Sequence, residues 1–139
     1  MTYGEAKEII RDYGFEDNSA MSEYQTIIKN SLNTAIQNIY DDMVIQLKGY
    51  YKKTLSTDEK EWEPVRPGLI NDLTEDDFVI ELPDNLLVLV PLLAAHFVWL
   101  DDDIQKSINY YNDYEDMRQK ILNSCFSDVK ATITGGIGW

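Results

Sequence analysis

The feature that most constrains the fold of this chain is the apolar run from Leu86 to Leu100. A helix built from these residues is hydrophobic on every side, which is the pattern of a helix enclosed by other elements. Such a helix would reach only about 22 Å, against roughly 30 Å for the apolar core of a bilayer, so the run predicts a buried core helix and no membrane span. Pro91 indicates either a kink or the point at which the main helix begins.

Three further helices are predicted from apolar residues at helical spacing. The first covers residues 2–13 and is expected to end at Gly14. The second is long and covers residues 22–42, with Ser22 and Gln25 in the pattern of a capping box. The last runs from residue 104 to about Asn123 along a stripe of apolar and tyrosine side chains, namely Ile104, Ile108, Tyr111, Tyr114, Met117 and Ile121.

Two short strands complete the predicted fold. Residues 43–51 and 78–82 are rich in β-branched and aromatic side chains, and they flank an acidic connection at residues 54–77. The predicted fold class is therefore mainly α: a small helical bundle with a long central helix, a short β-hairpin-like pair and an extended C-terminal tail.

The tail begins after Ser127, so the expected division is a helical domain at residues 1–127 and an extended docking tail at residues 128–139. Its glycines and β-prone residues argue against a helix, and a terminal Trp139 is a favoured interface anchor. Docking onto a partner by strand addition is preferred over a disordered end. The residues predicted to make this contact are Thr132, Ile133, Thr134, Ile137 and Trp139.

Charge narrows the function classes. The chain has 25 acidic and 12 basic residues, which gives a formal net charge of -13. A surface this negative repels phosphate, so sequence-independent nucleic-acid binding is not expected, and like charge opposes casual self-association. The single cysteine, Cys125, allows no internal disulfide, and no export signal is recognisable, so the protein is expected to work in a reducing cytoplasm.

The sequence contains few candidate catalytic residues. His96 is interpreted as a satisfied core or interface histidine, because no carboxylate or serine stands at a suggestive spacing, and Cys125 is interpreted as a small hydrophobic side chain. Asp101, Asp102 and Asp103 are interpreted as capping and solvated charges rather than metal ligands. A stacking platform for bases, formed by Trp99 with Tyr110, Tyr111 and Tyr114, is disfavoured because its neighbourhood is acidic, so core and interface roles are preferred. No catalytic residue, metal or cofactor is therefore predicted.

The order of these elements resembles that of the head-tail connector (adaptor) proteins of tailed bacteriophages. The likeness covers most of residues 20–123. Its motifs are Glu81-Leu82-Pro83-Asp84, the apolar helix closing at Phe97 to Asp103, and Tyr110 to Glu115. The region between the two predicted strands is shorter here than in many members of that family, which affects the shape expected for the tail-facing loop.

The resemblance implies a structural protein without catalytic residues, in a ring of usually about twelve copies beneath the portal. Such a ring joins the DNA-filled head to the tail, so the implied partners are the portal protein, neighbouring copies and a tail-side stopper or tail-completion protein. The implied location is the virion neck, assembled in the host cytoplasm. Residues 131–139 would reach the portal. Asp101, Asp102 and Asp103 would be lumen or rim acids of a channel that lets DNA pass without binding it.

Two other classes stay open on the sequence. One is a small metal-dependent enzyme, such as a nuclease, that uses Asp101 to Asp103. The other is an acidic DNA mimic or inhibitor that acts alone against a basic partner.

Overall fold

The computed structural model describes residues 1–15 and 22–134, with side chains as far as Phe126. The described part is mainly helical, as predicted. Its elements in chain order are α1 (Tyr3–Asp12), α3 (Gln25–Ile39), the π-helical turn η1 (Tyr40–Val44), α4 (Lys48–Leu55), the 3₁₀ turn η2 (Asp84–Leu86), α5 (Leu89–Trp99) and α6 (Ile104–Thr134).

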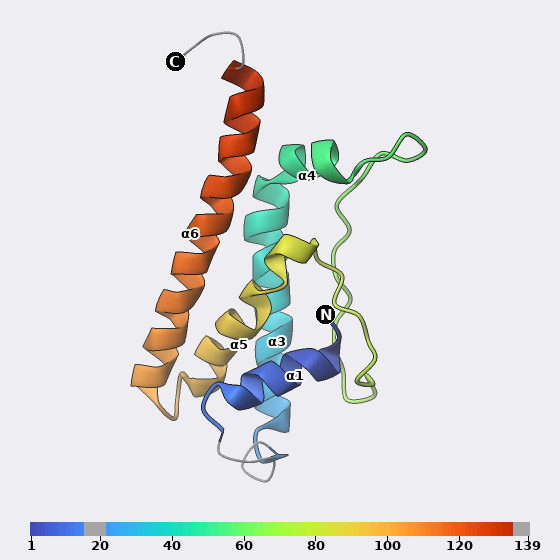
Figure 1. The fold of residues 1–139 in the computed structure, drawn as a ribbon. Coiled ribbons are helices and arrows are strands. Elements are labelled where there is room, and N and C mark those ends of the chain that lie inside the picture. Colours follow the sequence, from blue (N-terminus) through green and yellow to red (C-terminus); the bar gives the residue numbers. More distant parts are fainter. Residues whose placement is uncertain (16–21, 135–139) are drawn as a thin grey trace.

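The centre of the bundle is α5, which packs against α1, α3 and α6 (Figure 1). Nine of its eleven residues are buried, and His96 and Phe97 are partly exposed. This confirms the enclosed helix expected from the apolar run. Pro91 lies in the first turn of α5, where a missing backbone N–H costs no intrahelical hydrogen bond, so it marks the start of the helix rather than a kink. No helix in the described ranges combines the length and the apolar character that crossing a membrane requires.

The first helix is also as predicted. The hydroxyl of Thr2 accepts a hydrogen bond from the backbone N–H of Glu5 at 3.1 Å, which caps α1. Gly14 has a positive φ of 114°, and a Cβ there would lie 3.1 Å from the ring of Trp99. By contrast, the capping box predicted at Ser22 is wrong, because α3 starts at Gln25 with Tyr24 as its N-cap and without a side-chain cap.

The predicted β-hairpin-like pair is wrong. Residues 43–51 lie in η1 and α4, and their buried members Met43, Val44, Leu47 and Tyr51 follow helical spacing. Their β-branched and aromatic content therefore reflects burial on one helical face. Within the described residues, the β-pairing of residues 78–82 is limited to an isolated antiparallel bridge from Val79 to Thr2. Their partner is thus the N-terminal end of the chain.

The last helix is longer than predicted. It contains 31 residues and ends at Thr134, so residues 128–134 are helical, and the extended conformation expected there is wrong. Extending an existing helix costs far less than starting one, and no helix breaker occurs before Gly135. Thr132, Ile133 and Thr134 therefore belong to α6. Ile137 and Trp139 lie outside the described residues.

Candidate interaction surfaces

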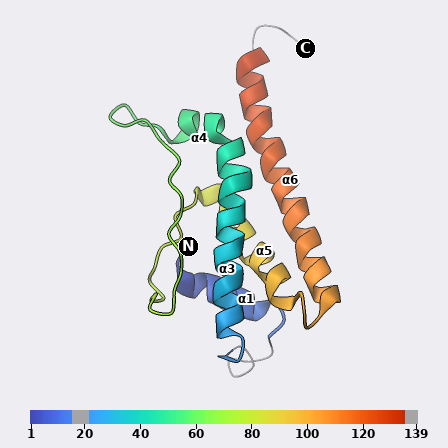
Figure 2. The same cartoon turned by 180° about the vertical axis from the view of Figure 1, so that it is seen from behind.

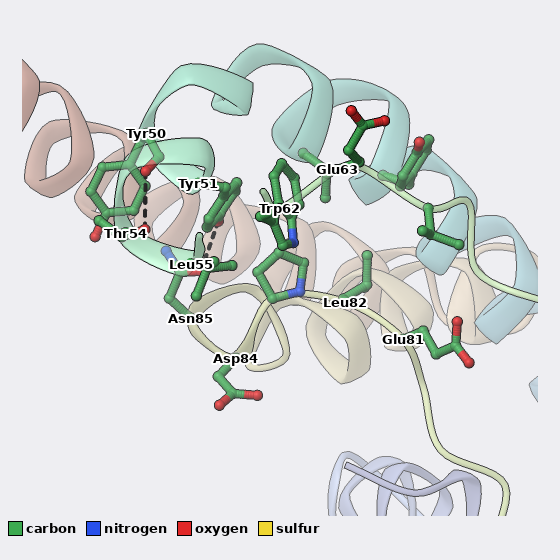
Figure 3. A pocket seen from close by; sticks show the side chains of 14 residues that line it. Tyr50, Tyr51, Thr54, Leu55, Trp62, Glu63, Glu81, Leu82, Asp84 and Asn85 are labelled. Atoms are coloured by element: carbon green, nitrogen blue, oxygen red, sulfur yellow. Dashed lines mark hydrogen bonds between the residues drawn. The ribbon is translucent and has the colours of Figure 1, made fainter. Parts of the chain in front are cut away.

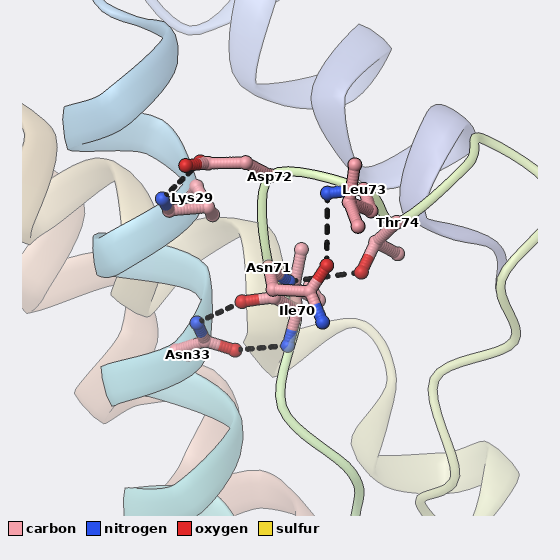
Figure 4. A network of polar contacts seen from close by, with 7 residues as sticks. All are labelled: Lys29, Asn33, Ile70, Asn71, Asp72, Leu73 and Thr74. Carbon is pink, nitrogen blue, oxygen red and sulfur yellow. Dashed lines mark hydrogen bonds and ion pairs between the residues drawn. The ribbon is translucent and has the colours of Figure 1, made fainter.

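A long irregular connection at residues 56–83 runs along α3, and its central part is held there by side chains (Figure 4). We call residues 64–74 the strap. The amide of Asn33 donates to the carbonyl of Ile70 at 2.7 Å and accepts from its N–H at 2.8 Å. The side chain of Asn33 thus pairs with both backbone hydrogen-bonding groups of Ile70, as a neighbouring β-strand would. Ile70 itself is 2% exposed and belongs to the core.

Three more side chains of α3 and η1 continue this attachment. Lys29 pairs with Asp72 at 2.5 Å, and Gln37 donates to the carbonyl of Pro67 at 2.9 Å. Arg66 donates to Gln37 at 2.8 Å and also forms an ion pair with Asp41. The four holding residues, Lys29, Asn33, Gln37 and Asp41, recur every four positions, so they form one polar stripe along the helix.

The strap turns sharply at residues 71–74. The N–H of Leu73 donates to the side chain of Asn71 at 2.8 Å, and the N–H of Asn71 donates to the hydroxyl of Thr74 at 2.9 Å (Figure 4). This turn leaves Leu73 90% exposed, while Val65 and Leu69 are 65% and 66% exposed. An irregular connection of this length is uncommon, and such connections are usually either functional or disordered linkers. The strap is thus an ordered segment that presents apolar side chains to solvent.

A second exposed apolar surface lies on α6. Ile104, Ile108 and Tyr111 are spaced by four and three residues, so they share one face of the helix, and each is at least 40% exposed. We call this face the α6 flank. Figures 1 and 2 show from opposite directions that α6 and the long connection lie on opposite sides of α3. The protomer therefore carries exposed apolar side chains on two elements that lie on opposite sides of α3.

An aromatic groove of about 560 Å³ lies between α4, the long connection and η2 (Figure 3). Its apolar lining includes Tyr50, Trp62 and Leu82, and the carboxylates of Glu81 and Asp84 lie at its edge. The groove can accept an apolar side chain. Among the described residues, its lining includes no histidine, cysteine or lysine.

The three consecutive aspartates lie in the turn between α5 and α6. Asp103 accepts from the N–H of Lys106 at 3.2 Å and so caps α6, while Asp102 accepts from the hydroxyl of Tyr24. Within the described ranges, no group of three or more acidic, histidine or cysteine side chains is arranged to hold a metal ion. The turn is at the end of the bundle opposite the C-terminal end of α6 (Figure 1).

His96 ties α5 to α6. Its Nδ1 lies 2.8 Å from the hydroxyl of Ser107, and that hydroxyl donates to the carbonyl of His96 at 2.7 Å. Ser107 is fully buried, so this contact holds two helices together and gives no accessible nucleophile. Cys125 is also buried, as expected, and lies 3.7 Å from the amide of Asn85.

The aromatic residues divide between core and surface. Trp99 and Tyr114 are buried, Tyr110 stacks on Tyr13, and Tyr111 stacks on His96 with ring centres 4.8 Å apart. Trp99 packs against Phe15 rather than against the three tyrosines of α6. The four residues therefore do not form one platform.

The buried phenol of Tyr114 makes the free energy of unfolding depend on pH in the alkaline range. Burial, with a smaller contribution from Asp42, raises its pKa from 10.0 to about 12. The folded state favours the neutral phenol, so this contribution is complete below pH 10 and is lost as the pH rises from 10 toward 12. We expect the free energy of unfolding, measured in urea, to fall across this range. In Tyr114→Phe the fall should be smaller by at most about 2–3 kcal/mol. Equal slopes for the two proteins would contradict this assignment.

The polar stripe of α3 was not predicted from the sequence, although the spacing of its residues is visible there. Lys29, Asn33 and Gln37 stand at a spacing of four beside the apolar stripe, which is also the pattern of a solvated helix face. Only the arrival of the strap gives these residues partners. Comparison with protein-family models, curated proteins and solved structures finds no match to this chain.

Proposed function

We propose that this chain is a structural virion protein, a head-tail connector that forms a ring beneath the portal and joins the capsid to the tail. The proposal starts from the sequence resemblance and gains support from the shape of the protomer. The observation that carries it is α6, whose last turns, up to Thr134, run past α4 (Figure 2). A helix of this kind can hold a docking segment away from the body of its own protomer.

In this function the C-terminal segment binds the portal protein. Thr132, Ile133 and Thr134 form the last turn of α6, and Ile137 and Trp139 follow it in the sequence. The segment therefore docks as the end of a helix with the terminal residues attached, instead of as an added strand. Binding of many copies to one portal ring would raise their effective concentration and so promote contacts between neighbours.

The acidic turn at Asp101 to Asp103 lies at the opposite end of the protomer, and we place it at the rim of the channel on the tail side. Carboxylates there repel the phosphates of passing DNA, so the DNA moves through without being bound. A tail-side stopper or tail-completion protein is the expected partner at this end. The complete ring belongs to the virion neck and is assembled in the host cytoplasm.

The test is quantitative mass spectrometry of purified virions from the source of this chain. We expect about twelve copies per particle, as in a closed cyclic ring. Absence of the chain from particles would reject the connector function. In that case the charge of -13 would favour the other candidate, an acidic inhibitor or DNA mimic that acts alone on a basic partner.

A further inference from the structure

We propose that neighbouring copies join through two different surfaces, the strap of one copy and the α6 flank of the next. The inference rests on the proposed function and identifies the surfaces that close the ring. It starts from the exposed apolar side chains of the strap, Val65, Leu69 and Leu73. A single exposed leucine needs no explanation, but three large apolar side chains exposed on one ordered segment make the strap a candidate interaction surface.

The way the strap is held favours a preformed interface. Asn33 and Gln37 fix its backbone, and the turn at Asn71 fixes the position of Leu73. A segment that is already ordered loses little conformational entropy when a partner binds. These polar side chains therefore hold the strap in place and also keep its apolar side chains exposed to solvent.

The occupant is a second copy because the complementary surface is present on the same chain. Ile104, Ile108 and Tyr111 form an apolar strip on α6, and that strip lies on the other side of α3 from the strap (Figure 2). Two unlike surfaces on opposite sides of one protomer give a head-to-tail contact, which generates a ring when the rotation closes. A symmetric dimer would instead use one surface twice.

The small area of the two surfaces explains why copies would not form a ring until they are held together on the portal. The exposed apolar area of each is on the order of a few hundred Å², below the roughly 800 Å² that each partner buries in a stable pair. A single contact is therefore weak. Closure of the ring and tethering on the portal make many such contacts cooperate.

The negative charge of the protomer also weakens the contact between free copies. Between Asp58 and Asp84 the chain has ten acidic residues, against Lys60 and Arg66 as the basic ones, and the whole protomer has a charge of -13. Neighbouring copies repel one another until salt screens the charges or a partner holds them together. A contact of this kind strengthens with added salt, whereas a contact made by ion pairs weakens.

Cross-linking with a bifunctional maleimide tests the proposal on the full chain. The variants are Leu73→Cys, Ile108→Cys and the chain carrying both; these positions are 90% and 44% exposed, so folding should persist, and Cys125 is buried. At high protein concentration in about 0.5 M NaCl, the double variant should give a ladder beyond dimers. A mixture of the two single variants should give dimers only, and each single variant should stay monomeric.

Three results would overturn the proposal: no ladder, a ladder that disappears with salt, or dimers from one single variant alone, which indicates a symmetric contact. The same cross-linking in virions separates it from the proposed function. If the chain is present in particles but gives no 73–108 cross-links, this interface is rejected and the connector function is retained. If the ladder forms in solution but the chain is absent from particles, the interface is retained and the connector function is rejected.

Discussion

Replacing Asn33 with alanine is expected to lower the free energy of unfolding by about 2–4 kcal/mol, because both backbone hydrogen-bonding groups of Ile70 lose their partner at once. Each hydrogen bond is worth about 1 kcal/mol net, and a backbone group left unpaired near the core costs more. Ile70 is 2% exposed, so release of the strap also weakens core packing. Urea denaturation measures the loss, and hydrogen exchange should show an unprotected Ile70 amide.

Asn30→Ala is the matched control. Asn30 is on the same helix but exposed, and within the described residues only its backbone carbonyl accepts a side-chain hydrogen bond, from Thr34. The same change there should alter the free energy of unfolding by less than about 0.5 kcal/mol. If both variants lose the same stability, the attachment of the strap contributes nothing, and the basis for a preformed interface is lost with it.

Replacing Trp139 with alanine is expected to reduce binding to the portal protein by about 30-fold or more. Large aromatic anchors at interfaces commonly contribute at least about 2 kcal/mol, which corresponds to that factor. The fold should be unaffected, because the core described from Tyr3 to Cys125 already joins α1, α3, α5 and α6. Recovery of the chain on immobilised portal protein, with the melting temperature measured in parallel, gives both quantities.

Trp139→Phe serves as the control for the tail, since it keeps an aromatic ring at the same position and should keep most of the affinity. Recovery of the alanine variant at the level of the unchanged chain would reject the docking role of Trp139. A drop in the melting temperature would instead show that the residue supports the fold.

The sequence was a good guide wherever a local pattern was sufficient. Helix α5 follows from an apolar run with no polar side, and α1 follows from its spacing and Gly14. The burial of Cys125 follows from its chemistry. In each case a residue's own neighbours in the chain determine its environment.

Residues 43–51 show where a local pattern was insufficient. Short apolar segments fit a helix or a strand about equally well, and the continuation of α3 through η1 into α4 decides for the helix. The C-terminal residues up to Thr134 illustrate the same limit, because β-prone residues continue a helix that is already formed.

By itself, the sequence determined the helical class, the buried α5 and the acidic character of the chain, because these depend on composition and periodicity. Only the tertiary structure decided that the acidic connection would lie on α3, that Asn33 would hold it, and that Ile104, Ile108 and Tyr111 would remain exposed. The physical reason is that these features depend on contacts between residues far apart in the chain. A polar or apolar stripe reveals a face of a helix, but the neighbour that covers that face is chosen by the packing of the whole bundle.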